Sequence, residues 1–187
     1  QEGEKVRLVP YRKKFVHKYH GWMKDAKLQV TSSNFLIAEL TASEPLSLQE
    51  EYEMQISWRD DPAKCTAIVL DRGIDDGGDD VASMAGDVNL FFNVEDDPTN
   101  CEIEIMIAEE RCRRRGLATE ALQMMMRFAV ERLQVARFYC KIGDGNEASM
   151  SLFRRLGYTV CNYVPAFKET ELELCVTEAT RGAIVAV

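Results

Sequence analysis

Residues 101–133 form one continuous stretch whose hydrophobic period changes in the middle. The first part alternates, which is the period of a strand, and the last part repeats apolar residues every three or four positions, as on one buried face of a helix. Between them lies an arginine-rich turn with Gly116 where the helix would begin. A strand that enters a helix through such a turn directs free backbone N–H groups, and the positive end of the helix dipole, at one point. The sequence therefore predicts an anion site, for which phosphate is the usual ligand. One strand face carries Ile103, Ile105 and Ile107, the other carries Glu102, Glu104 and Met106, and the helix face carries Ala118, Ala121, Leu122, Met125, Phe128, Ala129 and Leu133.

A simpler interpretation of the same stretch is a core strand and helix joined by a solvated basic loop. Two common phosphate motifs are absent from the sequence, G-x-x-x-x-G-K-[ST] and G-x-G-x-x-G. Binding of nucleoside triphosphates or of dinucleotides therefore has no support.

Composition narrows the possible classes of ligand and location. The chain has 187 residues, 46% of them hydrophobic, and a formal net charge of -8, which fits one domain and disfavours nucleic-acid binding despite the basic run 111–115. No apolar run approaches the roughly 20 residues of a membrane span, and the first residues lack the apolar core of a signal peptide. The six cysteines are dispersed without a C-x-x-C pair, so they indicate a reducing compartment, and we expect a cytoplasmic protein. Cys112, inside the basic turn, is the one cysteine for which a reactive thiol is considered.

The rest of the chain gives two helices, then a series of strands, then alternating helices and strands, which is an α+β order. Ser47 and Glu50 have the spacing of a capping box. We expect a mobile acidic loop at 71–80, an edge-type strand at 168–177 and a loosely held tail at 178–187. The expected helices are 11–29, 48–58, 117–133 and 146–156, and the expected strands are 5–10, 66–70, 84–94, 101–108, 136–142, 158–164 and 168–177.

The basic turn matches a known family signature. Residues 113–118, RRRGLA, fit the pattern [QR]-x-x-G-x-[GA], and a Thr-Glu-Ala-Leu run follows at 119–122. Further along come a strand, the N-x-x-S motif of Asn146 and Ser149, and a Leu-Gly-Tyr sequence at 156–158. In these features the chain resembles the GNAT superfamily of N-acetyltransferases, and within it the ribosomal-protein N-acetyltransferase branch and the N-acetyltransferase 9-like group. The resemblance extends over residues 5–176, with VRLVPY, GDVNLF, EIEIMIAEE and KIGDGNE among the characteristic strings.

This resemblance implies a fold and a cosubstrate. The fold is one mixed central sheet of about seven strands, splayed at two central parallel strands, with helices on both faces. It implies a single domain over 1–187, with a core at 5–176 and acetyl-CoA in the wedge between the splayed strands. No metal is implied, and with no third ligand nearby His17 and His20 are expected in surface or packing roles. Asn146 is interpreted as a helix N-cap, a cofactor contact or both. The implied cofactor-binding residues are Met106, Ile107, Ala108, Arg113, Arg114, Arg115, Gly116, Leu117, Ala118, Thr119, Asn146, Ser149 and Phe153.

Amide formation from a thioester needs an unprotonated amine, a polarised carbonyl and a proton for the leaving thiolate. Glu102 and Glu104 are the candidate bases, because mutual repulsion and partial burial would raise at least one pKa toward neutrality. The alternative is that both project from a solvated face. The chain has Lys141 where one bacterial branch of the family has Glu, and Phe153 where many members have a Tyr acid. The leaving thiolate would then take its proton from water or from a hydroxyl such as that of Ser149.

The resemblance implies an amine acceptor on a protein or peptide, either an N-terminal α-amine or a lysine. Two alternatives stay open: a small-molecule or polyamine acetyltransferase, and a catalytically silent acetyl-CoA-binding module that acts through a protein partner. We expect no nucleic-acid or membrane partner, and a monomer or homodimer. Residues 30–42 are an apparent insertion relative to the resembled group, interpreted as an added strand, a flap or a disordered loop.

Overall fold

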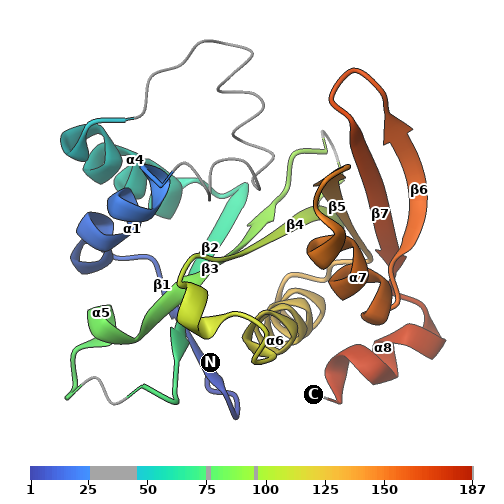
Figure 1. Cartoon of the computed structure of the whole chain (residues 1–187). Helices are drawn as coiled ribbons and strands as arrows, with labels where there is room; N and C mark the ends of the chain where they lie inside the picture. The colour runs from blue at the N-terminus through green and yellow to red at the C-terminus, as the bar shows by residue number, and fades with distance from the viewer. Residues whose placement is uncertain (26–45, 75–76, 95–96, 187) are drawn as a thin grey trace.

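The computed structural model of the chain describes residues 1–25, 46–74, 77–94 and 97–186. The apparent insertion at 30–42 therefore lies outside the described residues. A seven-stranded mixed sheet runs through the molecule in the order β1-β2-β3-β4-β5-β7-β6 (Figure 1). This confirms the predicted sheet, and every neighbouring pair is antiparallel except β4 and β5. The strands are β1 (Val6–Pro10), β2 (Lys64–Asp71), β3 (Met84–Phe91), β4 (Asn100–Ile107), β5 (Arg137–Gly143), β6 (Thr159–Val164) and β7 (Glu169–Cys175).

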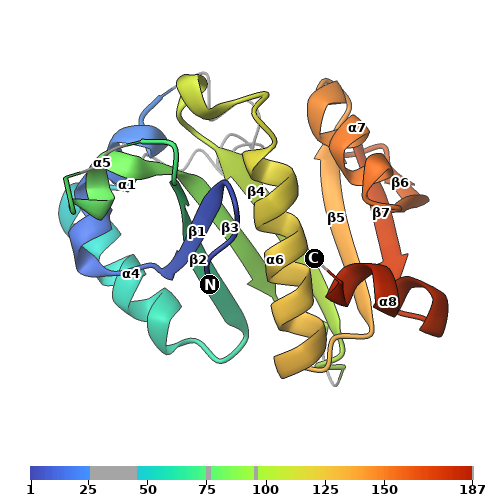
Figure 2. The ribbon, with the colours of Figure 1, turned by 90° about the horizontal axis from the view of Figure 1, so that it is seen from below.

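Helices cover both faces of the sheet, each with its own apolar cluster. One cluster lies under α1 and α4, around Phe15, Tyr19 and Ile68. The other packs α6, α7 and α8 on the opposite face (Figure 2), around the fully buried Ile103, Leu122 and Phe138. The helices are η1 (Lys13–Phe15), α1 (Val16–Met23), α4 (Leu48–Asp60), α5 (Asp80–Ser83), η2 (Glu110–Cys112), α6 (Leu117–Arg132), α7 (Glu147–Arg155) and α8 (Glu178–Val185).

The two parallel strands at the centre of the sheet separate after a short paired segment. β4 and β5 are paired only from Asn100 opposite Arg137 to Glu102 opposite Tyr139. β4 then continues to Ile107 and β5 to Gly143 without pairing to each other. The predicted splay is thus confirmed, and the wedge opens toward the ends of both strands, beside the first turns of α6 and α7 (Figure 2).

The ends of α4 and α7 agree closely with their local sequence. The capping box at Ser47 and Glu50 is present at the start of α4. Gly157, with φ +92°, ends α7 in the left-handed conformation that a C′ glycine adopts. In α4 the buried face is not purely apolar, because Ile56 is 48% exposed while Glu51 and Gln55 are buried.

Two predictions about the last segments of the chain are wrong, and the predicted acidic loop is shorter than 71–80. Residues 178–185 are not a loose tail but α8, which is capped by Thr177 and buries Ile184 against the core. β7 is not an edge strand, because it pairs with β5 on one side and β6 on the other. The acidic segment at 71–80 is anchored at both described ends, since Asp71 is buried in β2 and Asp80 forms ion pairs with Arg7 and Lys14.

Gly86 in β3 permits a close approach of two strands next to the wedge. It lies opposite Ile107, and a Cβ added there would be 1.8 Å from the carbonyl oxygen of Met106 and 2.8 Å from its carbonyl carbon. A backbone atom cannot move aside as a side-chain end can, so Gly86→Ala should destabilise the fold by about 2–4 kcal/mol. Urea denaturation measures this change. Gly21→Ala is the matched control, because a Cβ there meets nothing within 4 Å and helical alanine is favoured over glycine. Equal stability of Gly86→Ala and the parent protein would contradict the predicted clash.

Candidate active site

The basic turn has the backbone geometry of an anion site. Arg114 and Gly116 both adopt positive φ, +58° and +84°, and Gly116 is the N-cap of α6 without any side-chain cap. Within the described part of the chain, the N–H groups of Leu117, Ala118 and Thr119 find no hydrogen-bond acceptor. These donors, together with the helix dipole, remain available to a bound anion. The structure thus brings the backbone of residues 113–119 together at the start of α6, as the sequence predicts.

Two arginines of the turn hold it in place. The guanidinium of Arg113 donates to the carbonyl oxygens of Ile107, at 2.9 Å, and of Ala108, at 3.0 Å. Arg115 forms an ion pair with Asp71, whose carboxylate is buried at the end of β2. Both side chains are therefore engaged with the protein, so they are less available to an anion than the free backbone N–H groups of the turn.

Lys5, which the sequence gave no reason to select, lies beside the same turn. The carboxylate of Glu120, in the first turn of α6, accepts hydrogen bonds from the backbone N–H groups of Glu4 and, at 2.8 Å, of Lys5. This contact fixes the N-terminal segment against α6. The Nζ atom of Lys5 is consequently 3.1 Å from the position that a Cβ on Gly116 would occupy. An exposed ammonium group is thus placed at the anion site from 111 residues away in the sequence.

Cys112 is not a reactive thiol. It is 1% exposed, and its Sγ atom donates to Asp71 at 3.4 Å. Burial, followed by the hydrogen bond to Asp71, raises the pKa of this thiol to about 11, so the nucleophilic thiolate is disfavoured.

The two glutamates of β4 lie on the same face of the strand but have different surroundings. Glu102 is buried and accepts a hydrogen bond of 2.9 Å from the Nζ atom of Lys141 in β5. Glu104 is half-buried, and its pKa is raised to about 7, first by burial and then by the charges of Glu102 and Asp87. Of the two carboxylates, Glu104 therefore has the protonation behaviour that a base for an amine requires at neutral pH. Lys141 serves as the counter-ion of Glu102.

The predicted residues of α7 have separate positions. Asn146 is the N-cap of α7, and its Oδ1 atom accepts from the backbone N–H of Ser149 at 3.1 Å. The capping interpretation is confirmed, and a cofactor contact by the remaining amide group stays a prediction, as does the role of Ser149. Phe153 lies in the core, 3% exposed, with its ring edge-on to Tyr158 at a centroid distance of 5.0 Å. Its ring is thus occupied in core packing, which gives no support to the predicted cofactor contact.

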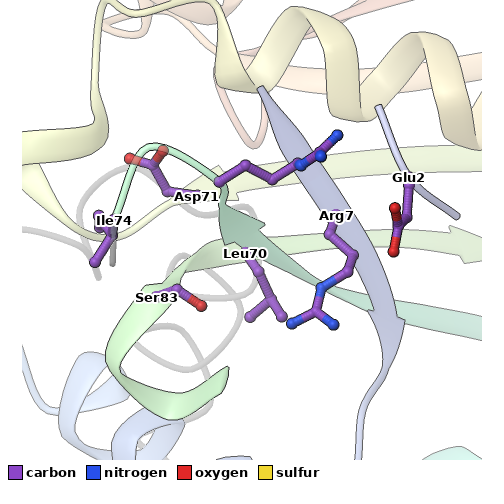
Figure 3. Close-up of a pocket in the computed structure, with 7 residues that line it drawn as sticks. Glu2, Arg7, Leu70, Asp71, Ile74 and Ser83 are labelled. Atoms are coloured by element: carbon purple, nitrogen blue, oxygen red, sulfur yellow. The ribbon is translucent and has the colours of Figure 1, made fainter. Parts of the chain in front are cut away.

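An open cavity of about 270 Å³ lies beside β1 and the end of β2 (Figure 3). It is lined by Glu2, Arg7, Leu70, Asp71, Arg72, Ile74 and Ser83, none of which was predicted to bind the cofactor. Its arginines are already engaged, Arg7 with Asp80 and Arg72 with the carbonyl oxygen of Gly3. The cavity therefore does not represent the predicted cofactor site.

The described residues show neither a metal-binding cluster nor a membrane-spanning helix. They contain no group of three or more His, Cys, Asp or Glu side chains that could hold a metal ion. No helix among them is long and apolar enough to cross a membrane.

Comparison with known proteins agrees with this geometry. Residues 5–159 match the family model described as the acetyltransferase (GNAT) domain. An N-acetyltransferase 9-like protein of Nematostella vectensis is 50% identical over 173 residues, covering 91% of this chain and 83% of the relative. The alpha/beta-tubulin-N-acetyltransferase 9 of Homo sapiens is 44% identical over 181 residues, covering 95% and 83%.

Solved structures share the fold at low sequence identity. The spermidine N-acetyltransferase of Vibrio cholerae, in complex with CoA and spermine, has a TM-score of 0.74 at 13% identity and covers 92% of this chain and 96% of that one. A domain from Methanocaldococcus jannaschii has a TM-score of 0.70 at 17% identity, covering 92% and 99%. With the family match over most of its length, the chain belongs to the GNAT acetyltransferase family and is an N-acetyltransferase.

Proposed function

We propose that the protein transfers the acetyl group of acetyl-CoA directly to an amine of a protein or peptide. The observation that carries this proposal is the uncapped start of α6, with free N–H groups at 117–119, placed at the mouth of the wedge between β4 and β5. A pyrophosphate at that turn would direct the rest of an extended thioester along the separated strands. Arg113 fixes the end of β4 by donating to the carbonyl groups of Ile107 and Ala108. At this end of the strand a backbone N–H is expected to polarise the thioester.

A protein acceptor is favoured by the relatives. The human and mouse relatives named alpha/beta-tubulin-N-acetyltransferase 9 are each 44% identical to this chain and cover 95% and 98% of it. The spermidine acetyltransferase shares the fold at only 13% identity, so it supports a polyamine acceptor much less. The net charge of -8 would attract a cationic acceptor of either kind. We also propose that the acceptor group is either an α-amine or a lysine. The cytoplasmic location and the monomeric or dimeric state stay predictions.

In the proposed reaction Glu104 accepts one proton from the ammonium group of the acceptor. The nitrogen then forms a bond to the acetyl carbon while the carbon–sulfur bond breaks. The second proton lost by the nitrogen is transferred to the departing sulfur, through water or through a hydroxyl such as that of Ser149. Because neither Cys112 nor another thiol is needed as a nucleophile, the buried, protonated state of Cys112 is consistent with direct transfer.

The test is transfer from radiolabelled acetyl-CoA to three sets of acceptors. These are peptides with free N-termini and no lysine, the same peptides with blocked N-termini and an internal lysine, and a polyamine panel. We expect turnover on one of the two peptide sets. Turnover on polyamines alone would replace the proposal with a small-molecule acetyltransferase. Binding of acetyl-CoA by calorimetry without transfer to any set would favour the silent binding module.

A further inference from the structure

Several buried polar side chains of the described residues lie on α1, α4 and β3, among them His20, Glu51 and Asp87. Four buried side-chain atoms lack a hydrogen-bond partner: Tyr11 Oη, His20 Nδ1, Glu51 Oε2 and Asp87 Oδ1. No other buried side-chain nitrogen or oxygen in the described chain is unpaired. Unpaired buried polar atoms are costly, so their concentration in one place points to a function other than packing.

Asp87 is the member of this group that belongs to the sheet. It is 2% exposed, and its Oδ2 atom accepts from Asn89 at 2.6 Å and from the hydroxyl of Tyr19 at 3.4 Å. Its other oxygen, Oδ1, has no partner. A leucine or an isoleucine would fill such a position at lower cost, and Ile68 does so directly opposite on β2.

The register of the sheet places Asp87 next to the candidate base. Asp87 lies opposite Met106 and Asn89 lies opposite Glu104, so that Asp87 and Glu104 are diagonal neighbours on one face. Diagonal pairs of this kind have Cβ atoms about 7 Å apart, which is within reach of two carboxylates. Asp87 lies directly opposite Met106, where the thioester is expected. Glu104 lies two residues before Met106 on β4.

The positive charges near Asp87 and Glu104 compensate their negative charges only in part. Lys64, from β2, has its Nζ atom over the rings of Trp58, at 2.8 Å, and Phe91, at 4.5 Å, and burial lowers its pKa to about 8. Lys141, from β5, is hydrogen-bonded to Glu102. Burial raises the pKa of Asp87 to about 6, so near neutral pH it is largely a second negative charge beside Glu104. The titratable groups around the two carboxylates are Tyr11, Tyr19, Lys64, Glu102 and Lys141.

We propose that Asp87 is a positioning residue for catalysis, whose negative charge strengthens the neighbouring Glu104 carboxylate as the base that takes a proton from the acceptor amine. This inference depends on the proposed function, in which Glu104 is the base. Asp87 itself does not touch the substrate. Its negative charge makes Glu104 a stronger proton acceptor, and the hydrogen bonds from Asn89 and Tyr19 hold Asp87 at that place.

The test is the pH dependence of kcat/KM in Asp87→Asn. Without the neighbouring charge Glu104 should lose its proton more readily, so the acidic limb of the profile should move to lower pH by about half a unit or more, while the plateau falls because Glu104 is a weaker base. Glu51→Gln is the matched control, since it neutralises another buried carboxylate beside α1 that the sheet register does not place next to Glu104. Its profile should coincide with that of the parent protein. An unchanged acidic limb in Asp87→Asn, or the same shift in both variants, would overturn the proposal.

Two further measurements test the proposal if Asp87→Asn does not fold or if the protein acetylates no amine. Tyr19→Phe removes only a donor to Asp87, so it should favour the protonated Asp87 and move the limb in the same direction, but less. If Asp87→Asn does not fold, an acidic limb in Tyr19→Phe equal to that of the parent would overturn the proposal. Titration of ¹³C-labelled glutamate carboxyls by NMR reports the pKa of Glu104 without turnover. A lower pKa of Glu104 in the variants than in the parent would support the role of Asp87 even if no amine were acetylated, and an unchanged pKa would refute it.

Discussion

Gly116→Asp is expected to abolish binding of acetyl-CoA, from an affinity near micromolar to at least about 100-fold weaker. The φ of +84° at this position disfavours any side chain, and a Cβ would lie 3.1 Å from the Nζ atom of Lys5. The added carboxylate would neutralise Lys5 and repel the phosphates that the free N–H groups of 117–119 are expected to bind. Isothermal titration of the purified variant with acetyl-CoA, beside the parent protein, measures the effect.

Two matched variants separate strain from charge at this turn. Gly116→Asn introduces a side chain of similar size that tolerates the left-handed region and carries no charge, so its affinity should lie between those of the parent and of Gly116→Asp. Lys5→Gln leaves the turn intact and removes one cation, so it should weaken binding several-fold and reduce the dependence on salt. Unchanged affinity in Gly116→Asp would refute the assignment of the anion site to this turn.

The parts of this site that the sequence predicts are those that depend on neighbours along the chain. A strand, a left-handed glycine and an amphipathic helix follow one another within 101–133, and each leaves its own periodic or conformational signal. Asn146 as an N-cap and Gly157 as a C′ residue are local in the same sense. Such features need no knowledge of which strand pairs with which.

The parts of the site that the sequence does not predict are contacts between distant segments. Lys5 reaches the turn only because Glu120 binds the backbone of the N-terminal segment, and Arg115 is fixed by Asp71, 44 residues away. The sequence places Asp71 in an acidic loop, since nothing in its neighbourhood indicates a buried partner. The sequence places Asp87 in the strand 84–94, and its position beside Glu104 follows only from the register of β3 with β4.

The errors in the fold have a related cause. The alternating sequence of β7 places Leu172 and Leu174 in the core and Glu171 and Glu173 on the other face, which is the pattern of an edge strand as well as of an interior strand with one polar face. The position of α8 at the end of the sequence suggests a loose tail, but the cap at Thr177 and the burial of Ile184 make it a helix. In both cases the tertiary neighbour decides between two readings of one pattern.

Glu104→Gln is expected to lower kcat by about 100-fold or more, which is the usual contribution of a general base. The parent protein should show a rate that rises with pH through about 7, the pKa of Glu104, because the ionised carboxylate is the active form. In the variant this limb should disappear. Steady-state kinetics on the acceptor found by the peptide screen, between about pH 5.5 and 9, measures both effects.

Stability and a second variant show whether the lost rate comes from the chemistry. The folded-state pKa of Glu104, about 7, lies above its ordinary value of 4.5, so between these values the native state binds more protons than the unfolded state, and stability falls as pH rises through this window. Glutamine cannot ionise, and Glu104→Gln should therefore be more resistant to denaturation than the parent above pH 7 while it is nearly inactive. Glu102→Gln should behave in the opposite way. It removes the buried carboxylate that accepts a hydrogen bond of 2.9 Å from Lys141, and this loss should lower stability more than it lowers kcat. Turnover that survives in Glu104→Gln but is lost in a folded Glu102→Gln would assign the base to Glu102 instead.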